Sequence, residues 1–164
     1  MDESRFGLMS IQRRCLVARG VKPVVPYQHR FQNFYLFGAY APGDGDHFTL
    51  ELPYCNTDCF QLYLDELSAH RPDEMKVLIV DNGAFHKAAR LVVPQNIVLH
   101  FLPPYSPELN PAEQIWRYIK DRLANTAFAT LDDLAQHVAQ IVRQLTAQII
   151  RSITGRKLYT QCTL

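Results

Sequence analysis

The feature that most constrains this fold is a short run at residues 75–80, apolar apart from Lys76, which is followed directly by Asp81-Asn82-Gly83. A segment of this length, bounded by charge on one side and by a turn on the other, is typical of a central parallel strand covered on both faces. Open α/β sheets bind ligands beyond the carboxyl ends of such strands, which is where Asp81 falls. We therefore expect Asp81 at the edge of a site. The alternative is a structural role, in which Asp81 caps a short helix near Ala84 or closes an Asx turn.

The remaining patterns predict a single α/β domain over residues 1–164, with a mixed sheet covered by helices. Strands are expected at residues 2–10, 33–42, 47–54 and 96–103, with a further short strand and a Gly/Pro connection within 13–27. A helix capped by Thr57 or Asp58 follows the third of these strands, and a weak helix is expected at 84–92. Two helices finish the chain. The first begins at Asn110-Pro111, and the second opens with a Thr130–Asp133 capping box and runs to Ile149.

Composition and net charge limit the kinds of partner that this chain can bind. The 164 residues, 48% of them hydrophobic, suit one well-buried core, and the net charge of +1 provides no large electrostatic footprint for nucleic acid. The four cysteines form no CxxC pair or zinc framework, which indicates reduced thiols in a cytoplasmic protein. No apolar run approaches the ~20 residues that cross a bilayer, so we expect no membrane partner.

Glu113 is a second candidate carboxylate. It stands three residues after Asn110, and helical spacing places Arg117 and Lys120 on the same face. A carboxylate flanked by cations suits a metal ion that faces phosphate groups. Two structural alternatives remain: a capping box, in which Glu113 reaches back to the N–H group of the cap, and an exposed ladder of helical salt bridges.

The segment joining these carboxylates is distinctive. Residues 102–116 read LPPYSPELNPAEQIW, residues 80–86 read VDNGAFH, and residues 2–7 read DESRFG. With these three segments in this order, the chain resembles the catalytic domain of the DDE transposases of the mariner superfamily, in particular the insertion-sequence 630 type. GVKP at residues 20–23 and FGAY at 37–40 also resemble family segments.

The resemblance implies a ribonuclease H-like fold with a five-stranded mixed sheet flanked by helices. It implies that Asp2, Asp81 and Glu113 converge on two Mg²⁺ or Mn²⁺ ions, for which oxygen ligands are suited, with no organic cofactor. The implied activity is hydrolysis of DNA phosphodiesters followed by strand transfer. The implied partner is double-stranded DNA, which includes both the transposon ends and the target. The resemblance also implies a homodimer on DNA, in the cytoplasm of a prokaryote and associated with the nucleoid.

Other residues near these motifs receive secondary roles. Asn82 and His86 are expected to contact a phosphate or to orient Asp81, and Trp116 is expected in the core. Glu3 should point away from Asp2, toward solvent or behind the site, because strand residues alternate. The candidates for DNA contact are Tyr105, Arg117 and Lys120, together with scattered basic residues at Arg13, Arg14, Arg19, Lys22 and Arg30.

The family pattern also exposes differences. The N-terminal helix-turn-helix region of such transposases and the start of the first strand are expected to be missing, because a single residue precedes Asp2. Two explanations fit this truncation. The chain is either the second reading frame of a split gene, completed by frameshifting from an upstream frame, or a decayed copy. The alternative function is therefore an inactive remnant that acts as a DNA-binding or interaction module. A phosphohydrolase with Asp81 as nucleophile fits poorly, since the DxD of that chemistry is missing.

Overall fold

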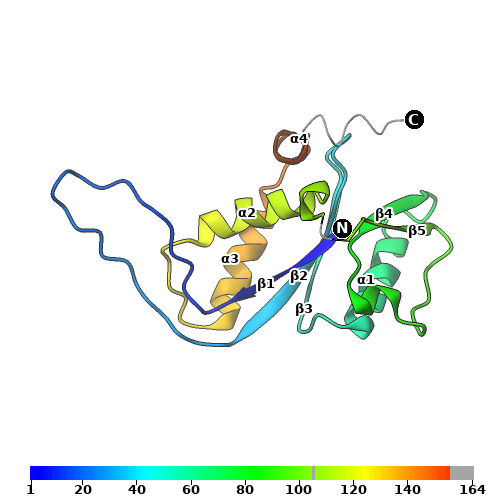
Figure 1. The fold of residues 1–164 in the computed structure, drawn as a ribbon, viewed down its shortest axis with the longest axis horizontal. Helices are drawn as coiled ribbons and strands as arrows, with labels where there is room; N and C mark the ends of the chain where they lie inside the picture. The colour runs from blue at the N-terminus through cyan, green and yellow to red at the C-terminus, as the bar shows by residue number, and fades with distance from the viewer. Residues whose placement is uncertain (105, 156–164) are drawn as a thin grey trace.

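The sheet is hydrogen-bonded in two parts, which adjoin near the N-terminus in Figure 1. The antiparallel part has the order β1-β2-β3 and the parallel part pairs β4 with β5. The strands are β1 (Asp2–Gly7), β2 (Asn33–Tyr40), β3 (His47–Leu52), β4 (Lys76–Val80) and β5 (Ile97–Phe101). A hydrogen bond from the Met1 amino group to the Ile79 carbonyl oxygen (2.8 Å) links the two parts. The predicted mixed α/β architecture is thus confirmed, whereas the single five-stranded sheet is not, because β1 lies beside β4 at Met1 rather than along its length.

The computed structural model describes residues 1–104 and 106–155, and four α-helices are assigned there. They are α1 (Thr57–Ala69), α2 (Ala112–Leu123), α3 (Leu131–Arg143) and α4 (Ala147–Thr154), with short 3₁₀ helices η1 (Ala84–Lys87) and η2 (Pro107–Leu109). The capping box of Thr130 and Asp133 is confirmed. Two other expectations were wrong. Asn56 caps α1, since its Oδ1 accepts from the Cys59 N–H, and the last helix divides where Thr146 caps α4.

Each face of the antiparallel part has its own apolar core. On one face, Phe6 and Leu36 pack with Trp116 of α2 and with α3 and α4. On the other, Phe37 packs with Phe60 and other residues of α1 and with the buried side of β4 and β5. Figure 1 shows α2 and α3 together on one side of β1 and β2, with α1 beside β4 and β5. The alternation of side chains along β1 and β2 therefore decides which core each residue enters.

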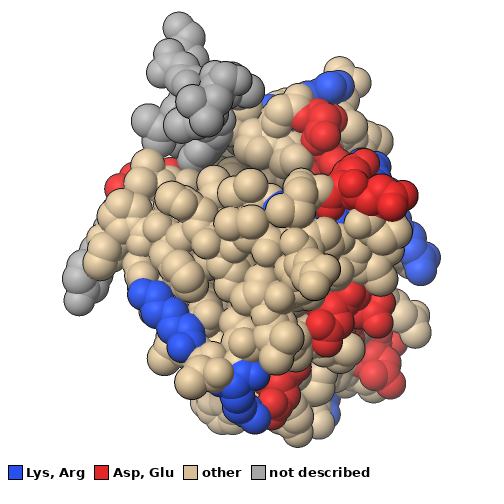
Figure 2. Space-filling model, turned by 90° about the vertical axis from the view of Figure 1, so that its right-hand side faces the viewer, with Lys and Arg blue, Asp and Glu red and all other residues tan. Residues whose placement is uncertain are grey.

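The outer face of β4 and β5 is not covered by another described segment. Leu78 and Val80 are buried against α1, but Val77 is 69% exposed, and Ile79 and Val98 are exposed as well. The prediction of a strand covered on both faces was therefore wrong. The end of the molecule formed by these strands shows a broad area without charged side chains (Figure 2). No helix in residues 1–104 and 106–155 is long and apolar enough to cross a bilayer.

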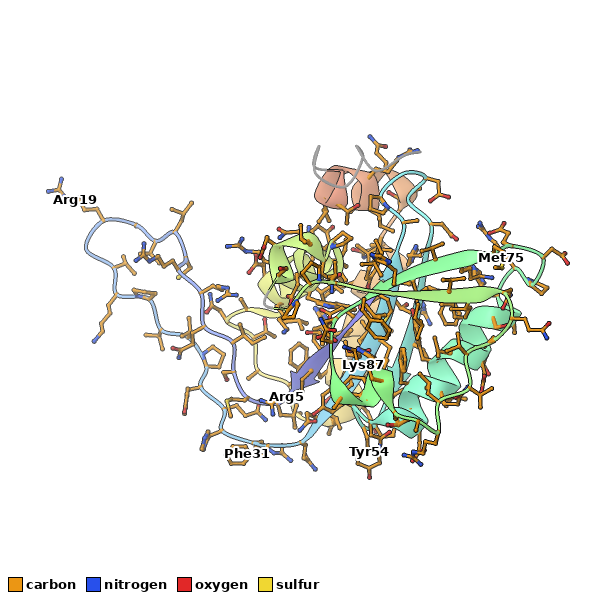
Figure 3. The ribbon with its side chains drawn as sticks, turned by 45° about the vertical axis from the view of Figure 1, so that its right-hand side comes forward. Arg5, Arg19, Phe31, Tyr54, Met75 and Lys87 are labelled. Carbon is orange, nitrogen blue, oxygen red and sulfur yellow. The ribbon has the colours of Figure 1, made fainter. Side chains whose placement is uncertain are left out.

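Residues 8–32 form a long excursion between β1 and β2, and Arg19 lies at its tip (Figures 1 and 3). The strand expected within residues 13–27 is not formed there. Backbone hydrogen bonds from Leu8 to Gln32 and from Ser10 to Gln28 hold the base of the excursion together. Apolar side chains beyond this base, including Leu16 and Val24, are exposed because the excursion packs on no sheet edge.

Gly38 on β2 makes room for the contact between the sheet and α2. It pairs with Asp2 across the β1–β2 ladder, and a Cβ atom at this position would lie 2.7 Å from the Trp116 ring and from the Tyr40 hydroxyl. We expect Gly38→Ala to lower the free energy of unfolding by about 1–3 kcal/mol, because buried rings must move. Urea denaturation followed by Trp116 fluorescence measures this loss. Gly43→Ala, which meets no atom within 4 Å, is the control and should leave stability nearly unchanged; equal effects would contradict the packing argument.

Candidate active site

Three carboxylates from separate elements line one cavity of about 370 Å³: Asp2 from β1, Asp81 from the end of β4 and Glu113 from the first turn of α2. The remaining lining residues come from the ends of β4 and β5 and from the start of α2: Asn82, Leu102, Pro103, Pro104, Ser106 and Asn110. The cavity therefore lies beyond the carboxyl ends of the parallel strands. As the side chains stand, no group of three or more His, Cys, Asp or Glu residues in the described chain is close enough to hold a metal ion.

Asp2 is held in a largely buried position under α2. Its Oδ2 accepts a hydrogen bond from Trp116 Nε1 at 2.8 Å. Burial raises the pKa of Asp2 to about 7, and the negative charges of Glu3 and Glu113 add to this shift, against the Trp116 hydrogen bond and the positive N-terminus. Burial and two neighbouring carboxylates thus both disfavour the charged form of Asp2.

Asp81 is 57% exposed and is held through one of its oxygens. Oδ1 accepts a hydrogen bond from the Gly83 N–H at 2.8 Å, so the Asx turn considered for this residue is present. The same Oδ1 lies 2.9 Å from Nδ1 of His86. This turn leaves Asp81 among the residues that line the cavity, so the structural role and the site role are compatible in one side chain.

Glu113 is exposed at the start of α2 and is not part of a capping box. Its side chain makes no hydrogen bond or ion pair with another residue in the described part of the chain. The buried Asn110 serves the helix instead: its Oδ1 accepts from the Ala112 N–H at 3.1 Å, and its Nδ2 donates to the Met1 carbonyl oxygen at 3.4 Å. Asn110 therefore ties the start of α2 to the start of β1, next to Asp2.

Of the other predicted residues, Asn82 and His86 lie next to Asp81, whereas Arg117 and Lys120 lie on α2. Asn82 donates from Nδ2 to the Leu102 carbonyl oxygen and so joins the ends of β4 and β5, while His86 is buried behind Asp81. Arg117 is exposed on α2, and Lys120 is half-buried with its Nζ 5.7 Å from the Phe6 ring centroid. Burial lowers the pKa of Lys120, although the charges of Glu113 and Asp2 act in the opposite direction. Tyr105 lies outside the described residues.

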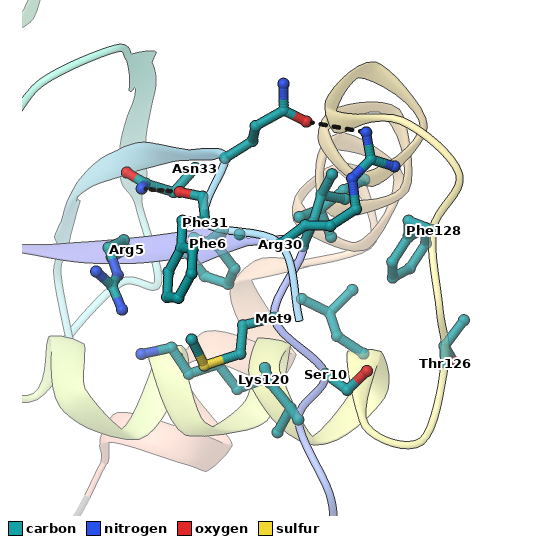
Figure 4. Close-up of a pocket in the computed structure, with 16 residues that line it drawn as sticks. Arg5, Phe6, Met9, Ser10, Arg30, Phe31, Asn33, Lys120, Thr126 and Phe128 are labelled. Atoms are coloured by element: carbon teal, nitrogen blue, oxygen red, sulfur yellow. Dashed lines mark hydrogen bonds between the residues drawn. The ribbon is translucent and has the colours of Figure 1, made fainter. Parts of the chain in front are cut away.

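Lys120 also belongs to a second cavity, of about 320 Å³, between the end of β1 and the second half of α2 (Figure 4). Its lining includes the cations Arg5, Arg30 and Lys120, with Phe6 and Phe128 among its apolar residues, and no Asp or Glu. Arg30 is fixed there by donating to the Ala129 carbonyl oxygen at 2.8 Å. A positively charged cavity thus lies along the same helix that carries Glu113.

Sequence reasoning missed two contacts at the site. Trp116 was correctly expected in the core, but its hydrogen bond to Asp2 was not foreseen, although it lies one helical turn after Glu113. Of the two positions expected for Glu3, toward solvent or behind the site, the structure shows the second. Glu3 points away from Asp2, is buried, and its Oε1 lies 3.0 Å from Nε2 of His86. The sequence signals were that Glu3 is adjacent to Asp2 and that His86 lies in the VDNGAFH segment of Asp81, where it is expected to contact a phosphate or to orient Asp81.

Comparisons with known proteins agree with the mixed α/β fold. A family described as DDE superfamily endonuclease matches residues 1–135. The uncharacterized protein y4pE/y4sA of Sinorhizobium fredii is 41% identical over 116 residues, which cover 70% of this chain and 86% of that protein. The class defined by fold and site is therefore that of an α/β nuclease, and the chain belongs to the DDE superfamily endonucleases.

Solved structures share the fold. A Mos1 transposase paired-end complex with the left transposon end matches 98% of this chain with a TM-score of 0.70 and 17% identity. A Mos1 mariner paired-end complex with Mn matches with a TM-score of 0.71 and 16% identity. This chain spans about half the length of these Mos1 chains, 51% and 52% respectively.

The raised pKa of Asp2 predicts how stability depends on pH. The pKa is about 7 in the folded chain against an ordinary value of 3.8, so the folded state binds the proton more tightly than the unfolded chain. This contribution to stability is full below pH ~4 and is lost as the pH rises to about 7. We expect Asp2→Asn to match the wild type at pH 4 and to exceed its stability at pH 8 by up to about 4 kcal/mol. Urea denaturation in EDTA at pH 4, 6 and 8 tests this; parallel pH profiles would contradict it.

Proposed function

We propose that this chain is the catalytic domain of a DDE transposase, which hydrolyses DNA phosphodiesters and transfers the freed strand to target DNA. The observation that carries the proposal is that Asp2, Asp81 and Glu113, from three elements distant in sequence, line one cavity. Membership of the DDE superfamily endonucleases supports it. So does the fold shared with Mos1 transposase in its paired-end complex with the left transposon end. On this proposal the chain works on double-stranded DNA, as a homodimer, at the nucleoid of a prokaryote.

The residues at the cavity fit divalent cations. Every candidate ligand is an oxygen donor, which suits Mg²⁺ and Mn²⁺ rather than softer metals. The pKa of Asp2 is raised partly by the repulsion of Glu3 and Glu113, and a cation among these groups would relieve that repulsion. We infer that Asp2, Asp81 and Glu113 hold two such ions. When bound, the ions supply positive charge that stabilises the attacking and leaving oxygens of an in-line phosphodiester displacement.

The three carboxylates differ in how firmly neighbouring groups hold them. Trp116 fixes the orientation of Asp2, and the Gly83 N–H fixes one oxygen of Asp81. Glu113 is the adaptable member, because it is exposed and unpaired among the described residues, and it can swing toward the other two carboxylates. A scissile phosphate in this cavity would face acidic residues from β1, β4 and α2, whose charge the ions must offset.

The path of the DNA strand follows from the cations near this cavity. Arg117 is one turn and Lys120 two turns from Glu113, and Lys120 leads into the second cavity with Arg5 and Arg30 (Figure 4). The segment 8–32 carries five of the 17 Lys and Arg residues and none of the 16 Asp and Glu residues. We infer that the phosphate backbone runs from the carboxylates along α2 toward this basic segment.

Metal binding is the first prediction of this proposal. Asp2→Asn, Asp81→Asn and Glu113→Gln should each weaken Mn²⁺ binding at least about tenfold in calorimetric titration, since each removes a charged ligand. Glu66→Gln, an exposed carboxylate on α1, is the matched control. The wild type should nick supercoiled plasmid DNA with Mn²⁺, and Asp81→Asn should not. A folded wild type that binds no Mn²⁺ would contradict the proposal and favour a non-catalytic interaction module.

DNA affinity provides a separate test. Arg117→Gln and Lys120→Gln should each weaken binding of a short duplex and reduce the slope of log K against log salt by about 1 if each cation contacts one phosphate. Fluorescence anisotropy in EDTA at several salt concentrations measures both quantities without the metal. Arg143→Gln at the end of α3 serves as control. Equal salt slopes for all three variants would rule out the path along α2.

A further inference from the structure

Glu3 and His86 form a buried pair on the face of the sheet opposite the candidate active site. Glu3 leaves β1 on the α1 side, and its Oε1 lies 3.0 Å from His86 Nε2. The Glu3 side chain is 6% exposed and that of His86 1%. Burying a carboxylate costs free energy, and its contact with His86 offsets part of this cost. Such a buried pair is weak evidence for a gain in stability, so a role at the site is considered.

The second ring nitrogen of His86 is directed at Asp81. Nδ1 lies 2.9 Å from Asp81 Oδ1, off the line of a hydrogen bond, and is a buried polar atom without a hydrogen-bond partner among the described residues. A buried unpaired nitrogen costs free energy that a small rotation of the Asp81 carboxylate would recover. His86 therefore favours one orientation of Asp81 over the others.

The ring itself has little freedom to move. Its centroid lies 4.5 Å from that of Phe60 in α1 and 4.1 Å from that of Phe85 in η1. Gly83 completes the enclosure, because a Cβ atom there would lie 3.0 Å from Asp81 Oδ1 and 3.1 Å from His86 Nδ1. The imidazole is thus a rigid link between a buried carboxylate and an exposed one.

We propose that Glu3 and His86 are positioning residues, which hold Oδ1 of Asp81 from behind so that its other oxygen is presented to the cavity. This inference rests on the proposed function, in which Asp81 is a metal ligand. It assigns the two adjacent acids of β1 different duties: Asp2 faces the cavity directly, whereas Glu3 acts through His86 on Asp81. A ligand restrained in this way binds metal more tightly, because less conformational freedom is lost on binding.

Two variants separate this role from a purely structural one. Glu3→Gln keeps the shape and hydrogen-bonding capacity of the side chain but removes its charge, and His86→Gln places an amide near Glu3 while removing Nδ1. The matched control is Glu51→Gln, an exposed carboxylate on β3. The first readout is the ¹³C chemical shift of the Asp81 carboxyl carbon in the metal-free chain, and the second is Mn²⁺ affinity by calorimetry, with thermal unfolding measured alongside.

We expect both variants to shift the Asp81 carboxyl signal and to weaken Mn²⁺ binding about tenfold, while Glu51→Gln does neither. An unchanged Asp81 signal and Mn²⁺ affinity, with lower thermal stability, would make the pair purely structural and overturn the inference. Unfolding of both variants would overturn it in the same way. A wild type without Mn²⁺ affinity would count against the proposed function, and the Asp81 signal would then decide the positioning role by itself.

Discussion

The pleat of β1 is the constraint on which the rest of the site depends. Adjacent side chains of a strand point to opposite faces, so Asp2 and Glu3 lie on opposite faces of the sheet. Asp2 meets Trp116 on the α2 side, and Glu3 meets His86 on the α1 side. A slip of one residue in the pairing of β1 with β2 would exchange these two carboxylates. The register that pairs Asp2 with Gly38 therefore determines the chemistry of the cavity as well as the packing of the sheet.

The parts of the fold that sequence predicted are those with local signals. The β4 strand followed by an aspartate, the capping box of α3 and the start of α2 just after Asn110 all depend on residues within one turn or one strand of each other. Asp81 and Glu113 could be nominated for the same reason. The contact between Glu3 and His86 could not be predicted, because the two residues are 83 positions apart in sequence. Strand alternation predicts the face to which Glu3 points, but not which residue packs there.

The incorrect predictions share the opposite cause, since each depended on a neighbour that the local pattern cannot specify. Valines in residues 13–27 favour a strand, but the described structure pairs this segment with no strand of either part of the sheet. The apolar period of α3 continues through Leu145 and Ile149, although Thr146 begins a new helix. The apolar run of β4 indicates burial on both faces, yet α2 and α3 lie over β1 and β2 instead.

The distribution of charge makes metal and DNA binding interdependent. The net charge of +1 conceals a basic segment at residues 8–32, so the remainder of the chain is net negative. At the cavity, Asp2, Asp81 and Glu113 would repel a phosphodiester. The pKa of Asp2 is raised first by burial and then by the negative charges of Glu3 and Glu113, so neighbouring carboxylates already repel one another there. Cations between these groups would lower the repulsion for protein and DNA alike. By thermodynamic linkage, DNA seated along α2 must then raise the affinity for the ions by the same factor that the ions raise the affinity for DNA.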